Sequence, residues 1–328
     1  MSAAEPVVDP VVIVTRRWPQ AVEDELRARF PGVRLNTDDV PLGEAGLREA
    51  LREADVVLPT VSDRLPADLF EGPLRCRFLG NFGVGYNHID VEAAARAGVV
   101  VTNTPGVLTD ATADLAMTLL LMVARRVGEG EREVRAGAWT GWRPTHMLGT
   151  DVTGKTLGVL GMGRIGAAVA RRAHFGFGMS VVFYDVFDPG DRHGIPGARR
   201  CATVEEVLET ADFVTLHMPG GGENTHLIDA ARLARMKPGA FLVNTARGDV
   251  VDTPALVKAL SEGTLAGAGL DVYEGEPDLP ADLLALDNVV LLPHLGSATT
   301  ETRTAMGMLV LENLQAFLDG REPPCRVG

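Results

Sequence analysis

Short apolar runs alternate with amphipathic segments along almost the whole chain. In its first third, β-branched runs occur at 11–15, 54–59, 76–81 and 98–103. Segments between them, such as 20–30 and 44–53, carry charged residues on one side and Leu and Ala on the other. This alternation predicts a parallel sheet with helices on both faces.

A long helical pattern follows this first series. The stretch "TDATADLAMTLLLMVARRV" has N-cap chemistry at Thr109 or Asp110, and Arg125 and Arg126 stand where a last helical turn is expected. The next segment, 135–155, is rich in Gly, Trp and Pro, so we expect it to be irregular.

A second alternating series occupies the rest of the chain. Its apolar runs predict strands at 156–161, 181–185, 213–217, 240–245, 267–272 and 288–292, with helices near 164–175, 204–210, 229–235 and 254–262. Six strands with five crossovers match a complete dinucleotide-binding unit. A final helix, roughly 299–319, is expected to return to the first domain. We therefore predict an α/β protein with two doubly wound parallel-sheet domains, one formed by residues 1–104 and 295–328 and the other by 105–294.

Length and charge limit the classes of function. A chain of 328 residues is long for a single core, and its formal net charge of -13 argues against a nucleic-acid-binding surface. Three cysteines (Cys76, Cys201 and Cys325) without a CxxC pair fit a reducing compartment. The first residues lack a basic signal-peptide region, and the apolar run 115–124 is too short to cross a bilayer. We expect a cytoplasmic protein without nucleic-acid or membrane partners.

A glycine pattern follows the first strand of the second series. Gly161, Gly163 and Gly166 form GxGxxG at a predicted strand-to-helix turn. The first glycine allows the tight turn, the second lets the backbone approach a pyrophosphate, and the third lets helix and strand pack closely. Amides near Arg164 and Ile165, at the helix start, would meet the negative charge. The pattern predicts a dinucleotide site.

The next predicted strand ends in an acid. Asp185 lies nineteen residues after Gly166, where a carboxylate can accept the ribose hydroxyls of NAD and repel a 2′-phosphate. Its immediate neighbours, 186–188, include no arginine. This favours NAD, with NADP as the alternative cofactor.

A second glycine-rich stretch, "GNFGVGYNHID" at 80–90, also lies between a predicted strand and helix. Gly80, Gly83 and Gly85 do not have the GxGxxG spacing. Exposed backbone amides here could bind a carboxylate. A simple β–α turn is the alternative interpretation.

Charged side chains follow three successive predicted strands. They are Arg247 in "NTARGDVVD", Glu276 in "GLDVYEGEP" and His294 in "VVLLPH". Ligands of open α/β sheets bind beyond the carboxyl ends of the strands, so these side chains are expected to converge. Arg247 can neutralise the carboxylate of a 2-keto acid, His294 can donate a proton to the keto oxygen, and Glu276 can orient the imidazole. A surface salt-bridge network is the alternative.

The other histidines lack the spacing of metal ligands, so we expect no metal site.

Six motifs together resemble those of the D-isomer-specific 2-hydroxyacid dehydrogenases. They are "VGYNHID", "TPGVLTDATADLAMTLLL", "GKTLGVLGMGRIG", "NTARGDVVD", "GLDVYEGEP" and "LLPHLGSAT", in order between about residues 80 and 320. The resemblance implies a flavodoxin-like substrate-binding domain, a Rossmann NAD domain and a homodimer. It gives catalytic roles to Arg247, Glu276 and His294, and substrate binding to Val84, Gly85 and Arg247. Beyond the glycine turn and Asp185, it places the cofactor at Thr109, His217, Pro219, Ala246, Asp271, His294 and Gly296.

Within that family, "GAWTGWRPTHMLGTD" is most similar to glyoxylate/hydroxypyruvate reductases. There a tryptophan of this loop reaches the neighbouring subunit's active site, which would be Trp142 here, with Trp139 as the alternative. Burial of that tryptophan at a dimer interface is a competing interpretation. Asp185 departs from NADP-preferring relatives and leaves the physiological direction open. The implied substrate is a small 2-keto or 2-hydroxy acid.

Other functions remain open at this point. A 3-phosphoglycerate dehydrogenase-like enzyme would need further cations for the substrate phosphate, and none can be placed. A formate dehydrogenase would carry glutamine in place of Glu276. A non-enzymatic NAD-sensing scaffold similar to the C-terminal binding protein corepressors would bind the dinucleotide without turnover.

Overall fold

The chain divides into two units with separate cores, seen in a computed structural model that describes residues 9–328, without the side chains of 191 and 192. Unit 1 comprises the described residues up to Leu108 together with Ala298–Gly328, and unit 2 comprises Thr109–Ser297. Each unit contains one sheet. No helix in this described part of the chain is both long enough and apolar enough to span a membrane.

Unit 1 has a five-stranded sheet in the order β1-β2-β3-β4-β12. The strands are β1 (Val12–Val14), β2 (Val56–Leu58), β3 (Phe78–Gly80), β4 (Val100–Thr102) and β12 (Arg326–Val327). The first four are parallel, and β12 pairs antiparallel with β4 at the edge.

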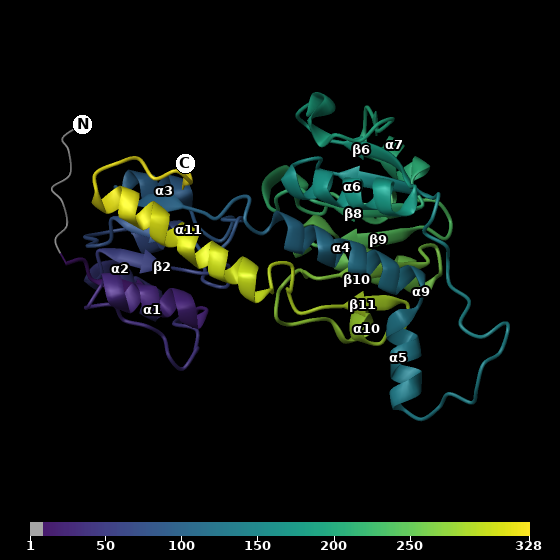
Figure 1. Cartoon of the computed structure of the whole chain (residues 1–328), viewed down its shortest axis with the longest axis horizontal. Helices are drawn as coiled ribbons and strands as arrows, with labels where there is room; N and C mark the ends of the chain where they lie inside the picture. Colours follow the sequence, from purple (N-terminus) through teal and green to yellow (C-terminus); the bar gives the residue numbers. More distant parts are fainter. Residues whose placement is uncertain (1–8) are drawn as a thin grey trace. The chain divides into compact units, whose positions relative to one another are not determined.

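Helices cover both faces of this sheet (Figure 1). They are α1 (Gln20–Arg29), α2 (Gly43–Glu53), the 3-10 helix η1 (Ala67–Phe70), α3 (Val91–Arg96) and α11 (Thr300–Leu318). On one face, Val310 and Leu314 of α11 pack with Phe78 and with Val22 of α1. The chain's last long helix therefore belongs to the core of unit 1.

Unit 2 has a seven-stranded parallel sheet in the order β11-β10-β9-β8-β5-β6-β7. Its strands are β5 (Thr156–Leu160), β6 (Ser180–Tyr184), β7 (Arg199–Arg200), β8 (Phe213–Leu216), β9 (Phe241–Asn244), β10 (Gly267–Leu270) and β11 (Val289–Leu291). The order reverses beside β5, which is where a doubly wound sheet opens a binding crevice.

Two layers of helices enclose this sheet. They are α4 (Thr109–Ala124) and α6 (Arg164–Phe177) on one face, and α7 (Val204–Thr210), α8 (Ala230–Leu233), α9 (Thr253–Ser261) and α10 (Ala281–Leu284) on the other. Figure 1 shows α4 lying across β9 and β10. Three short 3-10 helices lie in the connections: η2 (Gly190–His193), η3 (Gly222–Asn224) and η4 (Gly248–Val250).

A separate helix after α4 was not predicted. Helix α4 ends at Ala124, and Arg126 has φ +53°, a left-handed conformation that interrupts the helix. The chain then forms α5 (Val127–Arg135), none of whose residues is buried. Arg125 and Arg126 thus lie beyond the helix whose last turn they were expected to form. With no buried face, α5 leaves little apolar pattern in the sequence.

The predicted fold class is confirmed, with two additions. All ten predicted strands are present, each within its predicted segment or one residue outside it. Strands β7 and β12 were missed because each has two residues and lies at a sheet edge. The sequence of β7, Arg-Arg, has no β-branched residue to indicate a strand.

Candidate active site

Three neighbouring strands of unit 2 carry the predicted acid–base and substrate-binding groups. Arg247 follows β9, Glu276 lies in the loop after β10, and His294 follows β11. Strands β9, β10 and β11 are adjacent and parallel, so their carboxyl ends lie at one edge. The three residues are brought together by strand order rather than by sequence proximity.

His294 and Glu276 form a direct pair. The Nδ1 atom of His294 lies 2.9 Å from Oε2 of Glu276, and the other carboxylate oxygen accepts a hydrogen bond of 2.8 Å from the amide of Tyr273. Burial raises the pKa of Glu276, but the bonds from His294 and Tyr273 and the charge of Arg247 outweigh it, so that pKa is lowered. The carboxylate is therefore ionised at neutral pH and leaves Nε2 of His294 for another partner.

The backbone around His294 is held by a buried acid. His294 has φ +55°, unusual for a residue with a side chain, and its amide donates to the carbonyl of Asp271 at 3.0 Å. The Asp271 carboxylate accepts the next two amides, of Leu295 at 2.6 Å and Gly296 at 2.8 Å. Burial raises the pKa of Asp271. Asp271 therefore supports the histidine as well as standing at a predicted cofactor position.

Arg247 supplies a partly buried cation. Its Nη1 donates to the carbonyl of Ala246 at 2.7 Å, and its own carbonyl accepts from Asn244 at 2.8 Å. Burial lowers the pKa of Arg247, opposed by the charges of Glu276 and Asp249. A guanidinium keeps its charge through such a shift. The site thus combines a fixed cation with a carboxylate–imidazole pair.

The glycine turn between β5 and α6 has the spacing a dinucleotide needs. Gly161 has φ +90°, and a side chain there would meet the backbone of His217 at 2.8 Å. A Cβ at Gly166 would lie 2.1 Å from the carbonyl oxygen of Gly161, so only glycine lets helix and strand approach this closely. Gly163, the N-cap of α6, faces open space instead. The predicted amides of Arg164 and Ile165 begin this helix.

Asp185 is fixed against that turn by main-chain amides. Its Oδ2 accepts from the amide of Met162 at 2.7 Å, and its Oδ1 accepts from the amide of Phe187 at 2.9 Å. Each carboxylate oxygen has a second lone pair, so both can still accept ribose hydroxyls. The acid predicted from spacing alone therefore lies next to the glycine turn.

Further groups at this sheet edge fit a bound dinucleotide. The hydroxyl of Thr245 is buried and has no partner among the described residues, so it is available to a ligand. His217 shares a 2.8 Å hydrogen bond with Thr215, and burial lowers the pKa of its ring to about 3, which keeps it neutral. Ala246 is buried at the end of β9, and Pro219 lies in the loop after β8.

Helix α4 is tied to the histidine loop. Thr109 is the first residue of this helix, and the hydroxyl of Thr112, one turn later, donates to the carbonyl of Gly296 at 3.0 Å. The same residue Gly296 gives its amide to Asp271. Helix α4, the His294 loop and β10 therefore form one connected support.

The predicted carboxylate-binding loop lies in unit 1, after β3. Asn81 is buried and donates to the carbonyls of Gly83 at 3.1 Å and Gly85 at 3.0 Å, while Asn103 donates to that of Val84 at 2.8 Å. The amides of Val84 and Gly85 have no acceptor in the part of the chain that the structure describes. With its carbonyls occupied and two amides unused, the loop suits an anion better than a simple turn would.

Trp139 and Trp142 lie in the irregular segment after α5. Trp142 is 82% exposed and Trp139 is 54% exposed, so neither packs into the core of unit 2. Such exposure is unusual for the largest apolar side chain.

Sequence reasoning missed Tyr273, which connects two of the strand ends. Its hydroxyl lies 3.1 Å from the carbonyl of Leu270 and 2.8 Å from that of Leu292, and its amide binds Glu276. The residue lies inside the "GLDVYEGEP" motif, but nothing in the spacing indicates that it reaches across to β11.

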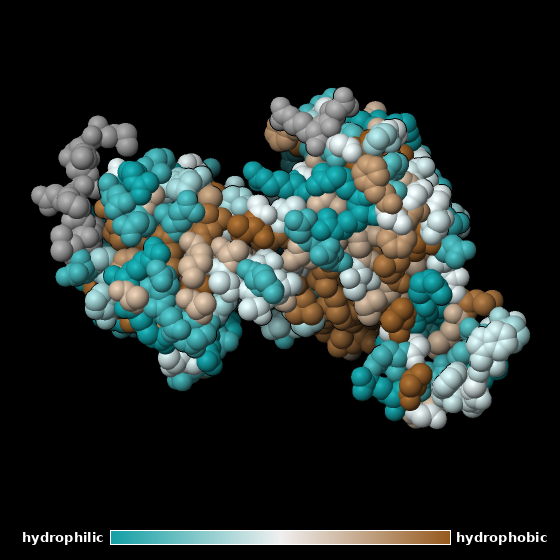
Figure 2. Space-filling view, viewed as in Figure 1, coloured by the Kyte–Doolittle hydropathy of each residue, from teal (hydrophilic) through white to brown (hydrophobic). Residues whose placement is uncertain are grey.

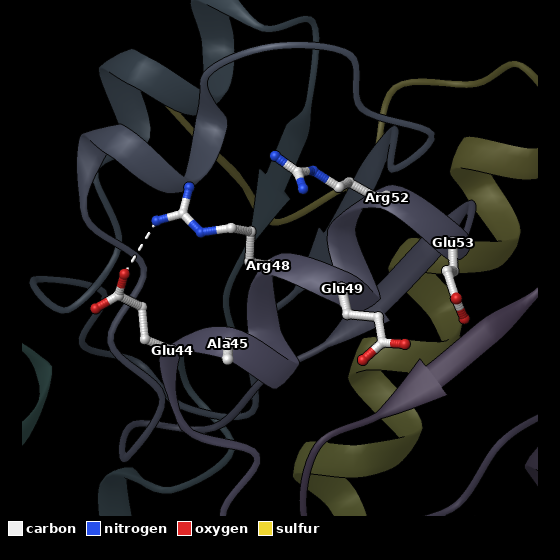
Figure 3. A pocket seen from close by; sticks show the side chains of 6 residues that line it. All are labelled: Glu44, Ala45, Arg48, Glu49, Arg52 and Glu53. Carbon is white, nitrogen blue, oxygen red and sulfur yellow. Dashed lines mark hydrogen bonds and ion pairs between the residues drawn. The ribbon is translucent and has the colours of Figure 1, made fainter.

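One surface hollow carries none of this chemistry. It lies on unit 1 along α2 (Figure 3), and its lining residues are Glu44, Ala45, Arg48, Glu49, Arg52 and Glu53. Arg48 forms ion pairs with Glu44 at 3.0 Å and with Asp68 at 2.6 Å. We assign this hollow no role.

Comparisons with known proteins agree with this geometry. A sequence profile described as "D-isomer specific 2-hydroxyacid dehydrogenase, NAD binding domain" matches residues 117–296. The chain is 48% identical to a glyoxylate reductase of Korarchaeum cryptofilum, over 96% of this chain and 95% of that protein. The NADPH-dependent glyoxylate/hydroxypyruvate reductase of Sinorhizobium meliloti, solved with NADP and malonate, superposes with TM-score 0.87 at 35% identity, over 98% of this chain and 97% of that one. A glyoxylate reductase from Paecilomyes thermophila gives TM-score 0.86 at 31% identity, over 98% and 99% of the two chains. The chain belongs to the D-isomer-specific 2-hydroxyacid dehydrogenases, and its unit 2 contains the NAD-binding domain of that family.

Proposed function

We propose that the protein reduces glyoxylate or hydroxypyruvate to the D-2-hydroxy acid, with NADH or NADPH as the reductant. The observation that carries this is the 2.9 Å pair between His294 and Glu276, formed beside Arg247 at the ends of adjacent strands. The glyoxylate reductases among the relatives support the substrate class.

The protein's groups divide the work of such a reduction. Arg247 binds the substrate carboxylate and polarises the keto oxygen. Within unit 1, the amides of Val84 and Gly85 are a separate candidate for binding a carboxylate. Glu276 holds Nδ1 of His294, which leaves Nε2 to donate its proton as the keto oxygen gains negative charge. The 2.9 Å contact with Glu276 fixes the orientation of the ring for that donation.

The cofactor supplies the hydride when it is bound. The glycine turn and the start of α6 would hold its pyrophosphate, and Asp185 its adenosine ribose. The other predicted contacts are Thr109 at the start of α4, and His217, Pro219, Ala246, Asp271 and Gly296, which follow the ends of β8, β9, β10 and β11. NAD is the primary cofactor in this proposal because Asp185 repels a 2′-phosphate.

A direct assay tests the proposal. Purified protein would be mixed with NADH or NADPH and a panel of 2-keto acids that includes glyoxylate, hydroxypyruvate and 3-phosphohydroxypyruvate, while the nicotinamide absorbance is followed. We expect glyoxylate or hydroxypyruvate to give the highest kcat/KM. A preference for the phosphorylated acid would favour the 3-phosphoglycerate dehydrogenase alternative, and tight NADH binding without turnover would favour a sensing scaffold.

We further propose a homodimer that uses the arm of unit 2, defined as α5 and residues 136–151. Figure 2 shows hydrophobic residues on the arm, and its exposed members include Val134, Trp142 and Leu148 at 60%, 82% and 67%. Contiguous exposed apolar surface marks interaction sites, and in the dimer these side chains would be covered together. In the dimer, Trp142 would approach the partner's substrate site. Sedimentation at micromolar concentration tests the dimer, and a monomeric protein with full activity would contradict it.

The three free cysteines support a reducing, cytoplasmic environment.

A further inference from the structure

The guanidinium of Arg200, which was not predicted from the sequence to belong to the dinucleotide site, lies next to Asp185. Arg200 of edge strand β7 donates through Nη2 to the main-chain oxygen of Asp185 at 2.8 Å. Its Nη1 lies 3.4 Å from the carboxylate of Asp188. The immediate neighbours of Asp185 contain no arginine, but the adjacent strand provides one.

Strand register places Arg200 and Asp185 on the same face of the sheet. Arg200 pairs with Phe183 in the parallel β6–β7 ladder, and Phe183 lies two residues before Asp185. Paired residues of neighbouring strands, and residues two apart on one strand, point to the same face. The guanidinium and the carboxylate of Asp185 therefore flank the same end of β6.

The present partners of Arg200 leave its guanidinium available. The side chains of Arg200 and Asp188 are 40% and 65% exposed, and exposed ion pairs are weak. A phosphate near the Asp185 ribose position would offer Arg200 a doubly charged acceptor with the geometry that its planar fork matches. If Arg200 gave up its contact with Asp188 to bind such a phosphate, little favourable free energy would be lost, because the ion pair with Asp188 is exposed.

We propose that Arg200 binds the 2′-phosphate of NADP(H) and so allows a site that carries Asp185 to accept both dinucleotides. The inference rests on the proposed function only in that the site binds a nicotinamide dinucleotide. Asp185 still repels the phosphate, so NADH remains the tighter ligand. Arg200 reduces the difference in affinity between NADH and NADPH.

The test compares Arg200→Met with Arg199→Met by titrating each protein with NADH and NADPH and measuring Kd from nicotinamide fluorescence, without substrate. Arg199 is the matched control, since it is the neighbouring residue of the same strand and pairs with Glu206 of α7 instead. We expect Arg200→Met to weaken NADPH binding by about five- to tenfold, the scale of one partly solvated charge-assisted contact, and to leave NADH nearly unchanged. Arg199→Met should leave the ratio of the two Kd values unchanged.

A second pair of variants checks the inference against the acid. Asp185→Ala should tighten NADPH binding, and the double variant Asp185→Ala/Arg200→Met should lose most of that gain. The contribution of Arg200 to NADPH affinity should also decrease as salt is added, because the contact between its guanidinium and the phosphate is solvent-exposed.

The outcomes separate this inference from the proposed function. An equal loss of NADH and NADPH affinity in Arg200→Met, or an unchanged ratio of the two, overturns the role of Arg200. So does a native protein that binds NADH and shows no binding of NADPH. A native protein that binds neither dinucleotide overturns the proposed function together with this inference, whereas binding without turnover leaves this inference standing.

Discussion

Main-chain amides, rather than other side chains, hold most of the acids in this site. Asp185, Asp271 and Glu276 each accept at least one backbone N–H at 2.6–2.9 Å. Charge-assisted bonds of this kind are strong and cost no side-chain entropy on the donor side. The position of each carboxylate therefore depends on the local backbone. A substitution that shifts the main chain should disturb the site even when it adds only a small side chain.

The close approach of helix α6 to the glycine turn depends on Gly166. Gly166→Ala would place a Cβ 2.1 Å from the carbonyl oxygen of Gly161, so either helix α6 or the turn must move. We expect a loss of stability of about 1–3 kcal/mol, the usual cost of overpacking, together with at least about tenfold weaker NADH binding. Thermal unfolding and NADH titration measure the two effects.

Gly176 provides the control within the same helix. A Cβ there would meet nothing within 4 Å, so Gly176→Ala should be neutral or stabilise the helix by up to about 1 kcal/mol. If both variants behave alike, close packing at the turn is not what requires glycine at position 166.

Among the connections between strands, the loop after β10 links Arg247, Glu276 and His294. Its backbone at Tyr273 lies so close to Gly248 that a Cβ on the glycine would stand 1.8 Å from the Tyr273 carbonyl carbon. The Tyr273 hydroxyl in turn bridges Leu270 and Leu292, which end β10 and precede His294. The loop is thus a connector between strands, and Tyr273 is a positioning residue.

Tyr273→Phe tests this connection. It removes one hydroxyl that bonds to two carbonyls, so we expect a stability loss of about 1 kcal/mol. We also expect a lower kcat with KM and NADH affinity little changed, because the imidazole is less well oriented. An effect on stability alone, with native kcat, would show that Tyr273 supports the fold but not the position of His294.

A second connection, between His226 and Glu274, predicts a pH dependence. Their 2.9 Å pair joins the loop after β8 to the loop after β10. The bond to Glu274, together with the charges of Asp252 and Asp249, raises the pKa of His226 despite opposing burial. Because this pKa is raised in the folded protein, the pair stabilises the folded state fully at pH values below the ordinary histidine pKa of about 6.5. That stabilisation is lost as the pH rises through the raised pKa.

His226→Gln should therefore lower Tm more at about pH 6 than at about pH 9. The pair is exposed, so its loss should cost no more than about 1 kcal/mol, or roughly 2–4 °C in Tm. Calorimetry at both pH values measures the difference. A Tm difference that is constant or grows with pH would contradict the assigned pair.

Across the two units together, the features that could be predicted from the sequence are those that depend on strand order and periodicity. Alternating apolar runs indicate where β9, β10 and β11 end, and adjacency of parallel strands then brings Arg247, Glu276 and His294 together. The same reasoning placed Asp185 beside the glycine turn. These predictions needed no knowledge of side-chain packing.

Other features depend on tertiary contacts that no local pattern records. Arg200 reaches Asp185 only through the register of a two-residue edge strand. Tyr273 bridges two strand ends across the sheet, and Asn81 and Asn103 hold the carbonyls of the Val84–Gly85 loop through side-chain bonds. Helix α5 buries no residue, so periodicity could not distinguish it from the irregular segment that follows.

The proposed NAD(P)H-dependent reduction depends on proton donation by His294, paired with Glu276. The most direct test measures kcat for glyoxylate and hydroxypyruvate in the native protein and in His294→Ala, with the Kd of NADH titrated on the same samples. We predict a fall in kcat of about 10²–10⁴-fold with a nearly unchanged Kd for NADH. A variant that keeps its turnover, or loses NADH binding in proportion to activity, would contradict it.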